Sequence, residues 1–201
     1  GVPLLILSIL LMVFFFILTA GLKVLKPQEA LVLTLFGKYV GTIKNDGFYF
    51  VHPFCTAFNP AAKTKLNQSG DVSKHEISVA KPEIEIVDKR ISLKIMTLNN
   101  NRQKINDCLG NPIEIGIAVT WRIVDTAKAV FNVDNYKEFL SLQCDSALRN
   151  VVRLYPYDVA PNVDTTGDGI ADEGSLRGSS EVVADRIRAV NQERVQNAGI
   201  E

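Results

Sequence analysis

The chain has 201 residues, with 22 basic and 22 acidic side chains and a formal net charge of zero. Proteins that bind nucleic acids normally carry a marked basic excess, so this balance argues against that class. The first charged residue is Lys23, and one long apolar run precedes it. Because no second run of that kind follows, the composition argues against a polytopic transporter and against a purely cytosolic protein. It predicts a membrane segment joined to a water-soluble body.

The apolar run extends from Val2 to Leu22 without a charge. A helix of that length spans about 30 Å, the thickness of a hydrocarbon core, and satisfies its own backbone hydrogen bonds there. The sequence therefore predicts a single-pass transmembrane anchor within residues 1–25. Its apolar side chains include Leu4, Ile9, Phe14, Phe15, Phe16 and Leu18.

A cleaved signal peptide is the alternative, since Thr19, Ala20 and Gly21 offer small residues near a cleavage point. The run is longer than a usual signal-peptide core and has no basic residues ahead of it, which favours a retained anchor. Lys23 and Lys26 favour a cytoplasmic body under the positive-inside rule. The side of the membrane stays open, because charges ahead of Gly1 would enter the same comparison.

The residues after the anchor first show strand patterns. Residues 30–36, 39–43 and 48–51 are rich in β-branched and aromatic side chains, with a turn signal at Asn45-Asp46-Gly47. Residues 89–96 alternate, with Ile91, Leu93 and Ile95 predicted on one face. Residues 113–123 alternate most clearly, and residues 102–108 are the predicted hairpin partner. Alternation of this kind predicts an antiparallel sheet with one buried face.

Helical patterns follow. Asn135 and Glu138 have the spacing of a helix N-cap, and apolar residues then recur at helical spacing until Pro156. A second helix is predicted from Ser180 to Ala198, with Gly199 as its C-terminal cap. Strands followed by segregated helices predict an α+β fold. The pattern starts another element at Ile200-Glu201, which predicts that this chain is part of a longer protein.

The residues typical of catalysis are few. There are two histidines, His52 and His75, and three cysteines, Cys55, Cys108 and Cys144, without metal-ligand spacing. No nucleotide-binding, nucleophile-elbow or zinc-protease motif occurs. Because Cys144 falls on the apolar helix face, we expect it to pack in the core. The sequence thus predicts no enzyme and no catalytic residue.

One acidic segment has a calcium-loop pattern. Asp164, Asp168 and Asp172 occupy the first, fifth and ninth positions of such a loop. The twelfth position, normally a bidentate Glu, is Ser175, and Thr166 stands at the third. Calcium is therefore one hypothesis for these three aspartates, and a solvated acidic loop between the helices is the other. No further cofactor is expected.

An aromatic run follows the anchor closely and also allows two interpretations. Its members are Phe48, Tyr49, Phe50, Phe54 and Phe58. Strand residues of this kind are usually buried, which is the first expectation. Alternatively, some of the rings rest in the lipid headgroup layer beside the anchor.

Several segments in order resemble the SPFH or band 7 superfamily of stomatins, prohibitins, flotillins and bacterial membrane-protease regulators, and most closely its stomatin-like branch. The apolar anchor precedes FGKYV at residues 36–40 and DGFYFVHPF at 46–54. NPIEI at 111–115, WRIVDTAKAVF at 121–131, Asn135-Tyr136 and LRGSSE at 176–181 follow. The acidic segment around residues 164–173 is longer than the corresponding stomatin loop.

The resemblance implies an α+β SPFH domain of antiparallel sheet plus helices, preceded by a transmembrane helix. Its subdomains would cover residues 26–95 and 96–201, with a coiled-coil region beyond them. It implies a membrane scaffold that forms a large homo-oligomer, or a hetero-oligomer with a paralogue. Such a ring or cage organises a membrane patch and its proteins, among them a membrane protease or channel as client.

Two other functions stay open. The first is a regulatory subunit that encloses an ATP-dependent membrane protease and restricts its substrates. The second is a membrane-associated hydrolase, which would need Cys55 to meet His52 or His75 in the fold. No nucleic-acid partner is expected.

Overall fold

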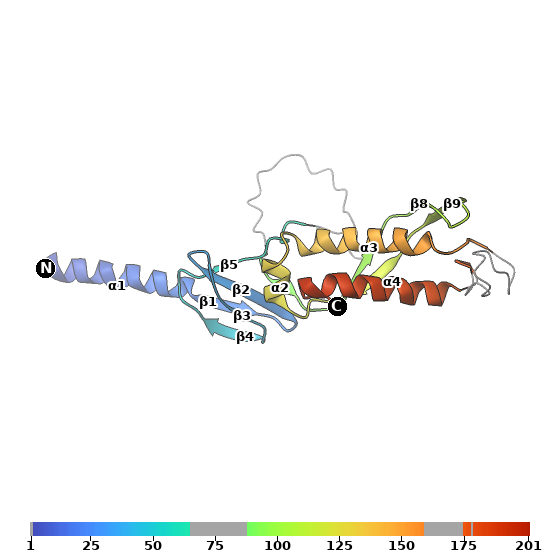
Figure 1. The fold of residues 1–201 in the computed structure, drawn as a ribbon. Helices are drawn as coiled ribbons and strands as arrows, with labels where there is room; N and C mark the ends of the chain where they lie inside the picture. The colour runs from blue at the N-terminus through green and yellow to red at the C-terminus, as the bar shows by residue number, and fades with distance from the viewer. Residues whose placement is uncertain (1, 65–87, 159–174, 178) are drawn as a thin grey trace, which may run out of the picture. The chain divides into compact units, whose positions relative to one another are not determined.

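The computed structural model describes residues 2–64, 88–158, 175–177 and 179–201 (Figure 1). The chain divides into two compact units, one containing residues 1–63 and 82–94 and the other containing residues 64–81 and 95–201. Antiparallel strands and helices together make the fold α+β, as the sequence predicts.

The first unit begins with a long apolar helix and continues as short antiparallel strands around β2. Strands β3, β5 and β6 pair with β2, and β1 pairs with β4. Because β2 has partners on both edges, five consecutive residues of this strand, Ala30 to Thr34, are buried. The elements are α1 (Val2–Ala20), β1 (Leu22–Leu25), β2 (Glu29–Leu35), β3 (Lys38–Ile43), β4 (Gly47–Phe50), β5 (Thr56–Ala57) and β6 (Ile91–Ser92).

The core of the strands in the first unit is small. Leu25, Leu31, Leu33 and Cys55 form its buried centre, and residues such as Tyr49 pack against them. The expectation that residues 89–96 alternate as one strand, with Ile91, Leu93 and Ile95 on one face, is wrong. Strand β6 ends at Ser92, and Ile91 is fully buried while Ile95 is exposed.

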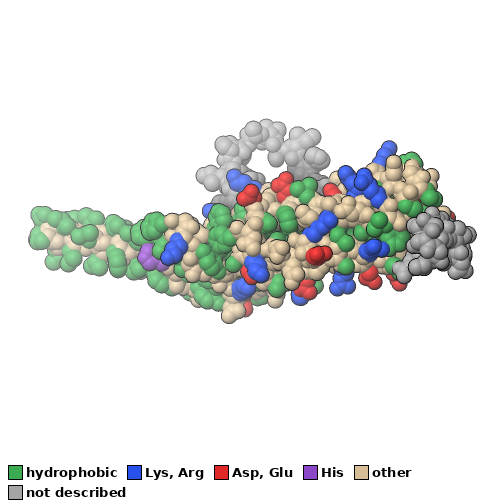
Figure 2. All heavy atoms as spheres, in the orientation of Figure 1, with side chains coloured by type: hydrophobic (Ala, Val, Ile, Leu, Met, Phe, Trp, Pro, Cys, Tyr) green, Lys and Arg blue, Asp and Glu red, His purple; other side chains and the backbone are tan. Residues whose placement is uncertain are grey.

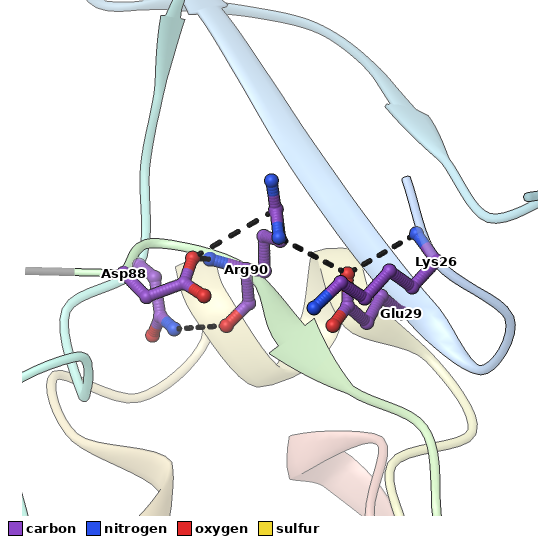
Figure 3. A network of polar contacts seen from close by, with 5 residues as sticks. Lys26, Glu29, Asp88 and Arg90 are labelled. Carbon is purple, nitrogen blue, oxygen red and sulfur yellow. Dashed lines mark hydrogen bonds and ion pairs between the residues drawn. The ribbon is translucent and has the colours of Figure 1, made fainter. Parts of the chain in front are cut away.

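A polar network fixes β6 to the start of β2 (Figure 3). The Glu29 carboxylate accepts a hydrogen bond from the Lys26 backbone N–H at 3.2 Å and lies 3.5 Å from the Arg90 guanidinium. The Arg90 backbone is held in turn, because its N–H donates to Asp88 at 3.0 Å and its carbonyl accepts from Asn59 at 3.3 Å. These bonds hold residues 88–92, which come late in the first unit, against its earlier residues at the start of β2 and at Asn59.

The second unit combines a bent antiparallel ribbon with helices. Strand β8 pairs with β9, which confirms the predicted hairpin, and β7 pairs with β10. The elements are β7 (Met96–Asn99), β8 (Gln103–Asn106), β9 (Pro112–Ile115), β10 (Ala118–Trp121), α2 (Thr126–Phe131), α3 (Tyr136–Val152), α4 (Ser180–Val195) and a 3-10 turn, η1 (Gln196–Ala198).

The single long strand predicted over residues 113–123 is two strands in the structure. β9 ends at Ile115 and β10 begins at Ala118, with Gly116 and Ile117 between them. A side chain at Gly116 would approach the Asn100 carbonyl oxygen to 3.2 Å, so the backbones come close at this bend. The predicted alternation survives the bend, because the odd positions face inward and the even positions are exposed.

Helices α3 and α4 pack together on a shared apolar core, side by side in Figure 1. The predicted N-cap is confirmed, because the Asn135 side chain accepts a hydrogen bond from the Glu138 N–H. Gly199 ends the last helical turn with a φ of 65°, as predicted. Cys144 is completely buried, which confirms its place in the core. The central residues of that core are Ile105, Ala147, Leu148, Val151, Val152, Tyr155, Val183 and Ile187.

Candidate membrane-attachment site

Helix α1 presents apolar side chains with no protein covering them. No residue of α1 is buried, and Leu4 and Phe15 expose 76% and 67% of their surface. Figure 2 shows these hydrophobic side chains covering the helix. A surface of this kind is stable in hydrocarbon and unstable in water, since contiguous apolar patches on soluble proteins are far smaller. Five of the six predicted anchor residues are exposed, and Leu18, nearest the strands, is half-buried.

The two polar side chains of α1 are satisfied inside the helix. The Ser8 hydroxyl donates to the Leu5 carbonyl at 2.8 Å, and the Thr19 hydroxyl donates to the Phe16 carbonyl at 2.7 Å. Hydrogen bonds of this type let a hydroxyl enter hydrocarbon without losing a partner. Within the described residues, α1 is the one helix long and apolar enough to cross a membrane.

Gly21 joins α1 directly to the strands. The Val51 N–H donates to the Gly21 carbonyl at 2.9 Å, one residue beyond the end of the helix. A Cβ atom at Gly21 would clash with the Val51 carbonyl oxygen, so no other residue fits without a shift of the backbone. The sequence offered Gly21 as part of a cleavage site, but the structure uses it for this close approach.

The aromatic run after the anchor is mostly exposed. Phe48, Phe50, Phe54 and Phe58 are solvent-exposed, so the expectation of burial is wrong for them, and only Tyr49 packs against the core. Among the described residues, β4 pairs with β1 alone, and Phe48 and Phe50 lie on the face of this two-stranded sheet opposite to Tyr49. One signal in the sequence could have predicted this exposed face. Two apolar residues stand two positions apart in each short strand, Leu22 and Val24 in one and Phe48 and Phe50 in the other, and residues with that spacing share a face.

Within the described part of the chain, Cys55 and His52 do not form a side-chain hydrogen bond with each other. His52 is exposed and its Nδ1 accepts the Phe54 N–H at 3.4 Å, whereas the Cys55 side chain is buried among leucines. His75, the other histidine considered for a hydrolase, lies outside the described residues. Burial, followed by the charge of neighbouring Asp145, raises the pKa of Cys144 to about 12, so this thiol is not a nucleophile at neutral pH.

The calcium hypothesis concerns residues that the structure does not describe. Asp164, Asp168 and Asp172 all lie outside the described ranges, so it stays a hypothesis. Among the described residues, no group of three or more His, Cys, Asp or Glu side chains is arranged to hold a metal ion.

A crevice of about 630 Å³ lies in the second unit between β10 and α4. Apolar residues such as Ile117, Val119 and Ile187 line it, and its charged residues are Arg122, Arg188 and Glu201. Neither histidine nor cysteine is among its lining residues, so it does not combine a nucleophile with a base. Beside it, Arg122 and Glu201 exchange two backbone hydrogen bonds of 2.8 and 3.0 Å, which pairs the end of the chain with the strand region after β10.

Comparison with known proteins agrees with this architecture. No curated protein matches the chain. The family model described as SPFH domain / Band 7 family matches residues 23–201, which is everything after the apolar segment. With an N-terminal helix able to span a membrane and an α+β body behind it, the chain belongs to the SPFH domain / Band 7 family.

Proposed function

We propose that the protein is a membrane-anchored scaffold of the stomatin-like branch and not an enzyme. Helix α1 holds each copy in the bilayer as a retained single-pass anchor. The soluble bodies associate side by side into a ring or cage, as a homo-oligomer or together with a paralogue. This assembly surrounds a membrane patch and organises the lipids and client proteins within it.

The observation that carries this proposal is the exposed apolar surface of α1 joined to an SPFH domain. The joint is short, because Gly21 alone separates the helix from β1, and the Val51 N–H bonds to it. A body attached this closely is held at the membrane surface with little freedom. Many copies held in this way can confine lipid collectively, which a single anchor cannot do.

The side-chain chemistry of the described residues also supports a scaffold over an enzyme. The described residues give no nucleophile paired with a base and no metal-binding cluster. Exposed sheet edges are suited to contacts between copies, because unpaired backbone groups seek partners. Among the described residues, β10 pairs with β7, and the backbone hydrogen bonds of the chain end begin only at Arg122, after β10 ends.

The experiment compares the full chain with a Leu11→Arg variant, in which a charge enters the middle of α1. A charged residue at a helix centre costs about 2.5–3.5 kcal/mol of membrane insertion. We expect the unchanged chain to resist alkaline extraction from membranes and to run as a large species in mild detergent. The variant should move to the soluble fraction. The proposal would be contradicted if the unchanged chain were extracted at alkaline pH, or if it ran as a monomer or dimer in mild detergent.

A further inference from the structure

We propose that the crevice in the second unit is a docking site for an extended peptide segment of a partner protein, which adds as a strand to β10. The segment bonds to the outer edge of β10, which we define as the backbone groups of Ala118 and Thr120. Its apolar side chains, at alternate positions, enter the crevice between β10 and α4. This inference goes beyond the proposed scaffold and does not depend on it.

The backbone hydrogen bonds around β10 show which groups point to the outer edge. The Ile117 carbonyl accepts a backbone N–H at 3.0 Å on the β7 side. Arg122 instead exchanges its two bonds with Glu201. Successive residues of an antiparallel strand direct their backbone groups to opposite edges, so Ala118 and Thr120 share the side of Arg122. Within the described part of the chain, no strand pairs with β10 on that side.

An antiparallel ladder already begins at one end of the outer edge. Ile123 and Ile200 form an antiparallel bridge, and the Arg122–Glu201 bonds of 2.8 and 3.0 Å continue it toward β10. An extended segment that pairs with β10 prolongs this ladder in the same sheet. Main-chain bonds of this kind supply the affinity when a peptide adds to a sheet edge, and side-chain pockets supply the specificity.

The crevice lies beside the same edge. Val119 and Trp121, which face inward, line it opposite Ile187 of α4. Ala118 and Thr120 line it too, although their side chains point to the other face of the strand, so the crevice reaches the backbone edge of β10. Every second side chain of an added strand would therefore enter an apolar space.

Two buried polar atoms that line the crevice have no partner among the described residues. They are Nε1 of Trp121, a donor, and Oδ1 of Asn191, an acceptor, in residues only 2% and 7% exposed. The Asn191 amide is held by its other end, because Nδ2 donates to the Cys144 sulfur at 3.7 Å. Buried polar groups are normally hydrogen-bonded, so this pair indicates a ligand with a polar group among apolar ones. A threonine or asparagine side chain offers both an acceptor and a donor.

A single extended segment fits this edge better than the sheet of a second copy does. Glu201 already pairs beside Arg122, which leaves the four residues of β10, Ala118–Trp121, for a partner. Four residues of strand are about 13 Å long. A wider sheet edge would meet the backbone of Glu201, whereas a short strand ends before it.

The test titrates the full chain in detergent micelles with a short fluorescein-labelled peptide. The inward positions of the peptide are valine with one central threonine, and lysine and glutamate alternate with them. Label anisotropy reports binding, and so does the emission of Trp121, the one tryptophan of the chain, which lines the crevice. We expect saturable binding with a change in Trp121 emission. A peptide of the same composition without the alternation is the control for binding to the micelle.

The proposal is overturned if the alternating peptide does not saturate the chain up to about 1 mM, or if the control peptide binds equally well.

N-methylation of the peptide distinguishes strand addition from insertion of apolar side chains alone. Methyl groups on the nitrogens of the lysine and glutamate residues remove the N–H groups that face Ala118 and Thr120, so affinity should fall at least about tenfold. Methyl groups on the valine nitrogens, which face away from β10, should change affinity less than about twofold. Equal effects of the two methylation patterns would contradict strand addition.

Two alanines of α4 provide a matched pair of variants. Ala184 and Ala189 are both exposed, but only Ala184 is among the lining residues of the crevice. Ala184→Phe should weaken peptide binding at least about tenfold, because the ring fills the space, and Ala189→Phe should leave it unchanged. Equal affinities of the two variants, with circular dichroism showing both folded, would place the peptide elsewhere and overturn the site.

Two other occupants are outcomes of the same experiment. Cross-linking between copies through a Thr120→Cys variant, blocked by no peptide, would assign the edge to a second copy and overturn the proposal. Peptide binding to the 201-residue chain that is absent from a longer natural form would assign the edge to residues after Glu201 and overturn it as well. Neither outcome affects the membrane anchor, which alkaline extraction tests separately.

Discussion

Gly21 is the residue on which the joint between α1 and the strands of the first unit depends. Its carbonyl accepts the Val51 N–H, and the space where a side chain would begin is taken by the Val51 carbonyl oxygen. We expect Gly21→Ala to destabilise the first unit by about 1–3 kcal/mol, because the two backbones must separate. The midpoint of thermal unfolding in detergent, followed by circular dichroism, measures this change.

Gly41 in β3 provides the matched control for that substitution. A Cβ atom at Gly41 meets nothing within 4 Å, so Gly41→Ala should change stability by less than about 0.5 kcal/mol. Equal midpoints for the two variants would contradict the close approach at Gly21.

Asp107 organises the turn between β8 and β9 in the second unit. Its carboxylate accepts hydrogen bonds from the backbone N–H groups of Leu109, Asn111 and Tyr157 and from the Asn111 side chain. Burial acts to raise the pKa of Asp107, but these donors outweigh it and hold the pKa below its usual value of 3.8. The ionised form is therefore the one that the fold stabilises.

The pH dependence follows from that direction. A carboxyl group with a lowered pKa in the folded state contributes stability above the unfolded pKa, and the contribution is lost as the pH falls through the folded pKa. We expect Asp107→Asn to lower the melting temperature at pH 7, because an amide NH₂ would face the donors that the carboxylate accepts. The difference from the unchanged protein should shrink below pH 3.8. A difference that stays constant from pH 7 to pH 3 would contradict this role.

At the scale of elements, local signals predicted helices better than they predicted strands. Asn135 and Gly199 carry the capping chemistry for the ends of α3 and of the last helical turn, and both are confirmed. Alternation from residue 113 to 123 predicted the inward side chains correctly. It did not predict the bend, because Gly116 matters only once Asn100 comes close to it in space.

The aromatic run shows why exposure could not be predicted from composition. Phe48 and Phe50 have the residue type of a buried strand, and their exposure depends on β4 having β1 as its partner strand. That pairing joins segments more than twenty residues apart, and no local pattern specifies it. Likewise, the sequence does not show that Phe36, in the turn between β2 and β3, has a positive φ of 50°.

At the scale of the whole molecule, one chain joins an uncharged apolar helix to a conventionally charged body. The uncharged segment became a helix with no buried residue, and every charged side chain belongs to the residues that follow it. The net charge of zero is therefore the average of an apolar anchor and a conventionally charged body. It says little about partners, whereas the position of the first charge predicted closely where the apolar helix α1 ends.

The central claim is that many copies, each anchored by α1, enclose a patch of membrane. Electron cryomicroscopy of the full-length protein in native membrane vesicles tests it most directly. We expect closed, symmetric arrays of bodies lying against the bilayer, with lipid and client proteins inside. Isolated single bodies scattered over the membrane at native abundance would contradict the scaffold.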